Sequence, residues 1–241
     1  AKLTKNPDYR LFDILYNSLP DTHKQILTTQ YRMIENIGNL ISKVFYRGII
    51  DTGCNDDEKR HGLSRYVGKS IVWFDTSANK KKSQKRTKGG SYINEEEKRI
   101  ILEILDDLKS TGELKGLDIT GYSGQKELLR KSIKATGLDK IASKIDINTL
   151  DAFQGRENDI IIYSTVRTRD SIGFQKEKER VNVAFSRAKK LLIVCGDKNF
   201  FYNFDDQDNK FVEIIDYISE EEECEIIQCD GGKLFERESN S

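Results

Sequence analysis

Short apolar runs alternate along the chain with stretches whose apolar residues recur at helical spacing. Several of the runs are apolar throughout, which is typical of parallel strands that are covered on both faces. They lie at 70–75, 117–120, 145–150, 159–166 and 191–196, and a last edge strand is expected at 224–229. The pattern therefore predicts a parallel sheet with a buried interior.

The stretches between these runs predict helices. The clearest is 94–110, where five apolar residues fall on one face of a helix: Ile100, Ile101, Ile104, Leu105 and Leu108. Further helices are expected at 8–19, 34–46, 125–135 and 177–190. Strand, helix and strand in succession predict an α/β fold, doubly wound, with a mostly parallel sheet and helices on both faces.

The first 50 residues are more helical than the rest. We expect a helical lead-in over 1–50 and an α/β domain over 51–241, together forming one domain. The chain begins with Ala and contains a single Met, at position 33, so it reads as a piece of something longer.

The composition indicates the compartment in which the protein works, but it does not indicate what the protein binds. Forty basic and forty acidic residues cancel, so net charge does not indicate a nucleic-acid ligand. The four cysteines lack the paired spacing of metal ligands, and Cys195 lies inside an apolar run. No apolar run has membrane-spanning length, so we expect an intracellular, cytoplasmic protein with free thiols and no membrane partner.

One segment, 79–88, is strongly basic. It holds six basic residues in ten and no acid, and Gly-Gly follows it. Two interpretations remain open, a flexible solvated loop or an electrostatic contact to a phosphate backbone.

The stretch "GLSRYVGKS" at 62–70 is close to a phosphate-binding loop. That motif needs four residues between its first glycine and Gly-Lys-Ser, whereas five lie between Gly62 and Gly68. A polar stretch precedes it and an apolar run follows, which is the reverse of a strand-loop-helix context. If the chain handles ATP, another piece must supply the phosphate cradle.

Three segments carry candidate chemistry: "LTTQYRM" (27–33), "TLDAFQGREND" (149–159) and "VNVAFSRAKK" (181–190). Each places an arginine at the end of an expected helix or strand. Arginines held in this way are suited to bind anionic oxygens bidentately, as phosphoryl transfer requires.

In this order, "QYRM", "DAFQGRE" and "NVAFSRA" resemble the fourth, fifth and sixth motifs of superfamily 1 helicases. The resemblance is to the group that contains the RNA helicase of nonsense-mediated decay and its DNA-acting relatives. "SYINEEE", "ITGYSGQ" and "TVRT" are lesser matches, and the whole covers about residues 10–200. It implies the second, C-terminal RecA-like motor domain. "QYRMIE" departs from the family's "QYRMHP", and Gly121 replaces a proline.

The resemblance implies a nucleotide site made of Gln30, Tyr31, Arg32, Gln154, Gly155, Glu157 and Arg187. Arg32 and Arg187 are expected to reach the γ-phosphate of ATP from across a domain cleft, with Gln154 sensing the nucleotide. Tyr31 is expected to stack on adenine, and Glu157 to accept from ribose hydroxyls. We expect the two guanidinium groups to converge on one gap at the carboxyl edge of the sheet.

The resemblance also implies a nucleic-acid contact. Thr149, Tyr122 and Ser123 are expected to touch the backbone of single-stranded DNA or RNA. ATP and Mg²⁺ would be bound mainly by an upstream RecA-like domain of the same polypeptide, with no metal ligand in this chain. This chain alone is therefore expected to have negligible ATPase activity.

Three alternatives stay open. "GYSGQ" resembles the nucleophile elbow of a serine hydrolase, but Gln125 stands in place of the second glycine, and both histidines, His23 and His61, precede the serine. A non-catalytic interaction module is the second alternative. The third is a translocase that does not unwind duplex. The residues do not distinguish DNA from RNA as the ligand. The resemblance to the family favours movement in the 5′ to 3′ direction.

Overall fold

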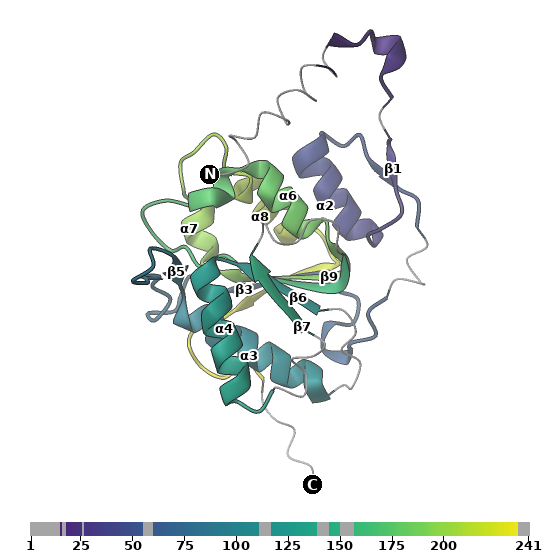
Figure 1. Cartoon of the computed structure of the whole chain (residues 1–241). Coiled ribbons are helices and arrows are strands. Elements are labelled where there is room, and N and C mark those ends of the chain that lie inside the picture. The colour runs from purple at the N-terminus through teal and green to yellow at the C-terminus, as the bar shows by residue number, and fades with distance from the viewer. Residues whose placement is uncertain are drawn as a thin grey trace.

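A six-stranded parallel sheet forms the centre of the molecule. The computed structural model describes residues 15, 18–25, 27–54, 60–110, 117–138, 145–149 and 157–235. The strand order is β10-β3-β9-β8-β6-β7, and every neighbouring pair is parallel (Figure 1). The strands are β3 (Ile71–Asp75), β6 (Leu117–Gly121), β7 (Ile145–Thr149), β8 (Asn158–Ser164), β9 (Ala188–Gly196) and β10 (Cys224–Gln228).

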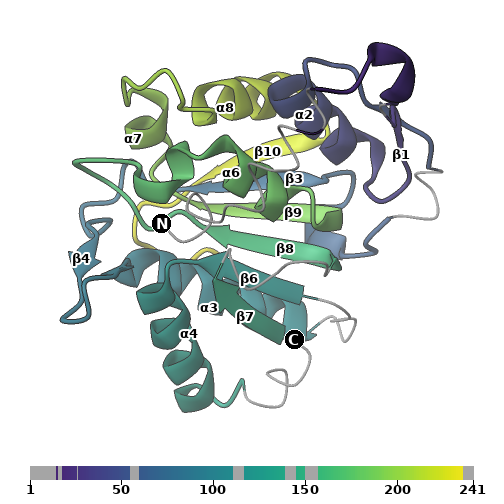
Figure 2. The same ribbon diagram turned by 45° about the horizontal axis from the view of Figure 1, so that its top comes forward.

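Helices cover both faces of this sheet, as Figure 2 shows. One face carries α2 (Glu35–Tyr46), α6 (Lys178–Phe185), α7 (Lys198–Tyr202) and α8 (Phe211–Glu220). The other face carries α3 (Glu95–Ser110) and α4 (Ser123–Ala135). Short 3-10 turns lie at η2 (Asp21–His23), η4 (Ser64–Tyr66) and η6 (Gly173–Lys176). The doubly wound α/β fold is confirmed, with β10 at the edge as expected.

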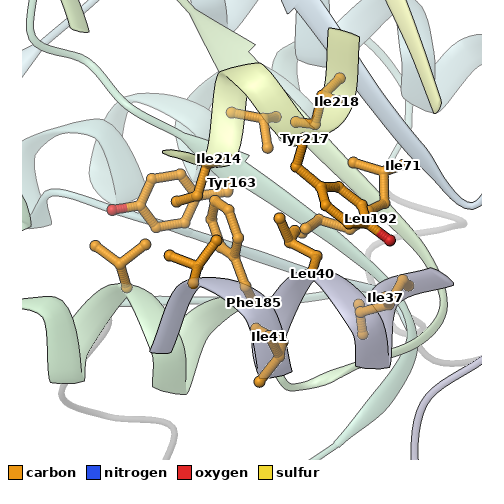
Figure 3. Packing of buried hydrophobic residues seen from close by; sticks show 14 of the residues in the cluster. Ile37, Leu40, Ile41, Ile71, Tyr163, Phe185, Leu192, Ile214, Tyr217 and Ile218 are labelled. Carbon is orange, nitrogen blue, oxygen red and sulfur yellow. The ribbon is translucent and has the colours of Figure 1, made fainter. Parts of the chain in front are cut away.

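The core follows from the alternation of side chains along buried strands. In β3, Ile71 and Trp73 point toward α2 and α8, whereas Val72 and Phe74 point toward α3. Figure 3 shows the first of these layers, in which Ile37 and Leu40 of α2 pack beside Leu192. Because α2 contributes fully buried residues here, this helix shares the core of the α/β domain.

Two small sheets lie outside the central one. β1 (Thr29–Gln30) pairs in parallel with β2 (Asp51–Thr52), and β4 (Lys85–Arg86) pairs antiparallel with β5 (Tyr92–Ile93). The second pair forms a hairpin that begins with the last four residues of the basic segment, 85–88. Lys82 binds the buried Asp197 at 2.7 Å, and Gln84 exchanges two hydrogen bonds with Thr168. The basic segment is therefore a turn followed by the first strand of a hairpin, and Lys82 and Gln84 connect it to the rest of the fold.

One predicted helix is too long. Residues 177–190 were expected to be helical, but α6 ends at Phe185 and β9 begins at Ala188. The reason is backbone pairing, since Asn158 N–H donates to Arg187 O and Ile34 N–H donates to Lys189 O. The expected helix at 8–19 lies mostly outside the described residues.

The structure supports the rejection of a phosphate loop at 62–70. This segment leads into β3 rather than following a strand, and Lys69 Nζ donates to the carbonyl oxygens of Glu222 and Cys224. His61 bonds Lys69 O at the start of β3, whereas Ser123 follows the far end of β6, so these two residues form no hydrolase pair.

Two further observations concern the cysteines and membrane-spanning helices. All four cysteines are free, and Cys195, Cys224 and Cys229 are buried. In the part of the chain that the structure describes, no helix combines the length and the apolar character needed to cross a bilayer.

Candidate functional site

The loop between β1 and α2 is built around one glutamine. Gln30 Oε1 accepts from the backbone N–H groups of Arg32 and Met33, both at 2.8 Å. Its Nε2 donates to Met33 O at 3.0 Å and to Thr52 Oγ1 at 2.7 Å. These four bonds use the full capacity of the side-chain amide. Gln30 therefore shapes the loop that presents Arg32, and its amide has no group left for a nucleotide.

Arg32 belongs to a cluster of charges. Its Nε lies 2.8 Å from Glu157 Oε2, and Glu157 Oε1 lies 3.2 Å from Lys189 Nζ. The hydrogen bond from Lys189 is the main cause that lowers the pKa of Glu157, and Arg32 adds to it. Both side chains of the Arg32–Glu157 pair are nearly half exposed, so a ligand has access to them.

Arg187 lies next to this cluster but is buried. Arg32 Nη1 is 3.4 Å from the carbonyl oxygen of Ser186, the residue before Arg187. Arg187 is only 5% exposed, and its Nε donates to Val183 O at 3.1 Å. The two arginines therefore reach the same edge of the sheet from opposite ends of the sequence. Arg32 is accessible, whereas Arg187 is held against the end of α6.

The cluster is at the amino edge of the sheet, which corrects the expected carboxyl edge. Glu157 directly precedes β8, and Arg187 directly precedes β9. Asn158 pairs with Ala188 at the start of these parallel strands. Because parallel strands begin at a common edge, residues that precede them gather there.

Tyr31 offers an exposed aromatic ring beside Arg32. The side chain is 69% exposed. It rests on Gly53, because a Cβ built there would stand only 2.5 Å from Tyr31 Cε1. Gly53 follows β2, so the end of the small parallel sheet is the platform on which the ring lies. An exposed ring on a fixed platform is suited to stacking on a base.

The residues expected to touch nucleic acid gather at the opposite edge. Thr149 ends β7 and pairs with Gly121 at the end of β6, and Ser123 begins α4. Thr149 is half-buried and Ser123 is exposed. They therefore lie at the carboxyl edge, with the sheet between them and the arginine cluster.

Tyr122, between these two residues, turns inward. Its ring centroid lies 4.4 Å from that of Phe174 and 5.9 Å from that of Tyr92. A Cβ at Gly173 would stand 2.3 Å from the Tyr122 hydroxyl oxygen. Burial raises the pKa of this hydroxyl to about 12. Tyr122 packs the carboxyl edge, and its hydroxyl is not presented to solvent.

Gln154 and Gly155 lie outside the described residues, as does all of 150–156. In the described part of the chain, no group of three or more metal-ligating side chains comes together.

Sequence reasoning missed three residues that shape these edges. Lys189 holds Glu157, Gly53 supports Tyr31, and Glu97 is fully buried at the carboxyl edge. Lys189 follows Arg187 by two residues, and Glu97 lies within "SYINEEE", so both stood inside stretches already quoted. Gly53 carried no signal beyond being a glycine after a short strand.

The fold and the cluster define a class of domain. A parallel sheet covered on both faces, with arginines gathered at one edge and no phosphate loop among its described residues, suits one lobe of a two-lobed nucleotide site. Arginine forks bind phosphate oxygens from outside the lobe that cradles them.

The comparisons agree with this class. A family profile described as AAA domain matches residues 8–199. The chain is 32% identical over 242 residues to an uncharacterized ATP-dependent helicase of Methanocaldococcus jannaschii, covering 94% of this chain and 34% of that protein. It is 35% identical to helicase SEN1 of Saccharomyces cerevisiae, covering 71% of this chain and 8% of that protein. With ATP-dependent helicase NAM7 of the same yeast the identity is 31%, over 71% of this chain and 18% of that protein.

The chain therefore belongs to the AAA domain family, as a C-terminal RecA-like domain of the superfamily 1 helicase type. It spans about a third of the length of the first of these relatives and less of the other two.

Proposed function

We propose that this chain is the arginine-supplying lobe of an ATP-dependent helicase or translocase that acts on single-stranded nucleic acid. The observation that carries the proposal is the approach of Arg32 to the backbone of Ser186, which brings the two motif arginines to one edge. Relatives named ATP-dependent helicases, and the match to the AAA domain family, support it.

The donors at the amino edge fit a nucleoside triphosphate. Arg32 offers a planar fork for phosphate oxygens, and Lys189 holds the Glu157 carboxylate by its other oxygen. Tyr31 offers a stacking surface for the base, and the ionised Glu157 can accept hydrogen bonds from sugar hydroxyls. ATP, with a metal ion held by an upstream lobe, would supply the free energy of the cycle. In our proposal, Gln154 and Gly155 complete this site.

The Arg32–Glu157 ion pair gives the site a resting state. Without a ligand, Glu157 holds the guanidinium of Arg32, and Lys189 holds the other oxygen of the same carboxylate. A phosphate group would compete for Arg32, while Lys189 keeps Glu157 ionised. An exposed ion pair is worth only about 0–1 kcal/mol, so this exchange has a low cost.

At the carboxyl edge, Thr149 and Ser123 are proposed to contact phosphate oxygens of a bound strand, the Ser123 hydroxyl exchanging its bond to Ser91 Oγ for one to a phosphate oxygen. Backbone contacts of this kind carry little sequence information. We therefore expect binding without strong base preference, with Tyr122 supporting this edge from within.

The proposal is tested by joining this chain to its upstream domain. The chain alone should hydrolyse ATP at a negligible rate, because phosphate cradle and metal ligands are expected in the upstream lobe. The joined protein should hydrolyse ATP, and an unstructured oligonucleotide should stimulate it. A phosphate-release assay with and without oligonucleotide measures both. Hydrolysis that no nucleic acid stimulates would favour an interaction module, and steady turnover by the chain alone would contradict the division of roles.

The Tyr31 platform gives a second prediction. Gly53→Ala should weaken nucleotide binding to the joined protein by about tenfold, because the new methyl group displaces the ring, and base–aromatic stacking is worth about 1–3 kcal/mol. Titration with a fluorescent ATP analogue measures the dissociation constant. Gly89→Ala is the matched control, because its Cβ would meet nothing closer than 3.9 Å. Equal nucleotide affinities for the two variants would contradict the proposed stacking of Tyr31 on the base.

A further inference from the structure

The basic hairpin is a surface that the proposed site does not use. Its strands β4 and β5 are joined by a turn that contains Lys88, Gly89 and Gly90. Lys80, Lys81, Lys85, Arg86 and Lys88 are all exposed. No acidic residue occurs between Thr76 and Tyr92. A cluster of like charges that does not stabilise the fold needs another explanation.

The basic side chains of residues 79–88 differ in their surroundings. Lys82 is used by the fold, in its ion pair with Asp197. Lys81 and Lys85 line a surface hollow of about 900 Å³ together with Glu95 and Glu96, which lie on α3. Arg86 follows Lys85 on the strand, so its side chain points to the other face. Within the described ranges, no carboxylate forms an ion pair with Arg86 or Lys88.

Direct contacts fix the hairpin to the carboxyl edge. Ser91 Oγ accepts from Gly124 N–H at 2.9 Å and lies 3.0 Å from Ser123 Oγ. The guanidinium carbon of Arg167 stands 4.0 Å from the centroid of the Tyr92 ring, and that ring meets Tyr122 edge to face. A Cβ at Gly124 would stand 2.9 Å from Tyr92 O, so only glycine permits this close approach.

These contacts link the hairpin to the proposed strand contact. Thr149 pairs with the buried Gly121, two residues before Ser123, and Ser123 contacts Ser91 beside the turn of the hairpin. Figures 1 and 2 both place the hairpin on the side of the molecule away from β1 and α2. The hairpin is therefore remote from the arginine cluster and adjacent to the proposed strand contact.

We propose that Arg86 and Lys88 of the hairpin bind backbone phosphates of the same nucleic-acid strand that Thr149 and Ser123 contact. This inference rests on the proposed function, since it extends the nucleic-acid site of that proposal. Two exposed cations on a hairpin anchored to the fold hold their charges at a fixed place beside the strand, and phosphate contacts of this kind do not depend on base sequence.

The test measures how salt weakens binding. A fluorescent 20-nucleotide oligo-dT and an oligo-U of equal length are titrated with the 241-residue chain at several NaCl concentrations, and anisotropy gives the binding constant. Each phosphate contact to a single strand contributes about 0.7 to the slope of log K against log [salt]. The double variant Arg86→Gln, Lys88→Gln should therefore lower the magnitude of the slope by about 1.4, for both oligonucleotides.

The control is Lys43→Gln, Arg47→Gln, which also removes one exposed lysine and one exposed arginine, here at α2 on the far side. Its slope should equal that of the unchanged chain. If the unchanged chain binds and the hairpin variant keeps its slope, the inference is overturned and the proposed function stands. If both double variants lower the slope equally, general charge explains the effect and the hairpin has no special role. If the unchanged chain binds neither oligonucleotide, the inference falls together with the nucleic-acid part of the proposed function.

Discussion

Arg32→Ala is expected to lower nucleic-acid-stimulated ATP hydrolysis by the joined protein by about 10³-fold or more. An arginine that neutralises charge developing on the transferred phosphoryl group contributes about 10³–10⁵ in rate. The fold should barely change, because Arg32 is nearly half exposed and its ion pair with Glu157 is a surface pair. Phosphate release under saturating ATP measures the rate.

Arg65→Ala is the matched control for this variant. Arg65 is also an accessible arginine in an ion pair, with Asp107 at 2.8 Å, and it lies on α3's face of the sheet. Its replacement should leave the rate within about twofold, since it contacts neither proposed site. A loss at Arg32 no larger than the loss at Arg65 would show that Arg32 does not act on the phosphates.

The largest effect on stability is expected at Glu97. This residue is fully buried, and its carboxyl group accepts from Val166 N–H at 2.9 Å and from Ser164 Oγ at 2.6 Å. Asn94 Nδ2 also donates to it, at 3.1 Å. Glu97→Ala leaves the Val166 N–H group and the Ser164 hydroxyl buried without this acceptor, at about 1–3 kcal/mol each, whereas Asn94 keeps its bond to Lys82 O. We expect a loss of the order of 4 kcal/mol in the free energy of unfolding.

Glu97→Gln separates hydrogen bonding from charge. Burial raises the pKa of Glu97 to about 8, so the group is mostly protonated near neutral pH, and the amide imitates that form. Because the folded pKa lies above the unfolded value, the folded chain binds more protons than the unfolded chain between the two values. The stability of the natural chain relative to Glu97→Gln should therefore fall as pH rises through this window, by at most about 1.4 kcal/mol per unit.

Urea unfolding measures both effects. Trp73 is the single tryptophan and is fully buried, so its fluorescence reports the core. Glu95→Ala is a control on the same helical turn, since Glu95 pairs with Lys98 at the surface and should change stability by less than about 0.5 kcal/mol. A stability difference between Glu97→Gln and the natural chain that does not vary with pH would exclude a raised pKa.

The hydrophobic pattern predicted the sheet well because its strands are covered on both faces. The expected run at 70–75 is β3, and the run at 117–120 lies within β6. β9 began three residues earlier than expected, since Ala188, Lys189 and Lys190 have no apolar signal. Their strand conformation comes from hydrogen bonds with β8 and with the loop before α2, which the sequence alone does not display.

The sequence motifs predicted that Arg32 and Arg187 would lie near each other, but they did not predict the edge of the sheet at which they lie. Arg32, Glu157 and the chain beside Arg187 do come together. The carboxyl edge of the sheet was wrongly predicted for these residues. Glu157 and Arg187 each come just before a strand, at its amino end, and not just after one. Inward turning of Tyr122 depends on Gly173, about 50 residues away, and no local pattern encodes that contact. The sequence cannot distinguish a Gln30 amide that binds a nucleotide from one that binds its own loop. Only the hydrogen-bond partners in the structure distinguish the two roles.

The separation of the two edges also sets a scale for mechanical coupling. From Asn158 to Ser164, β8 spans six residue steps, or about 20 Å. The arginine cluster and the proposed strand contact are therefore separated by about the length of one strand of the sheet. In the proposed function, a tilt of the lobe about its arginine edge would displace the nucleic-acid edge in proportion to that length.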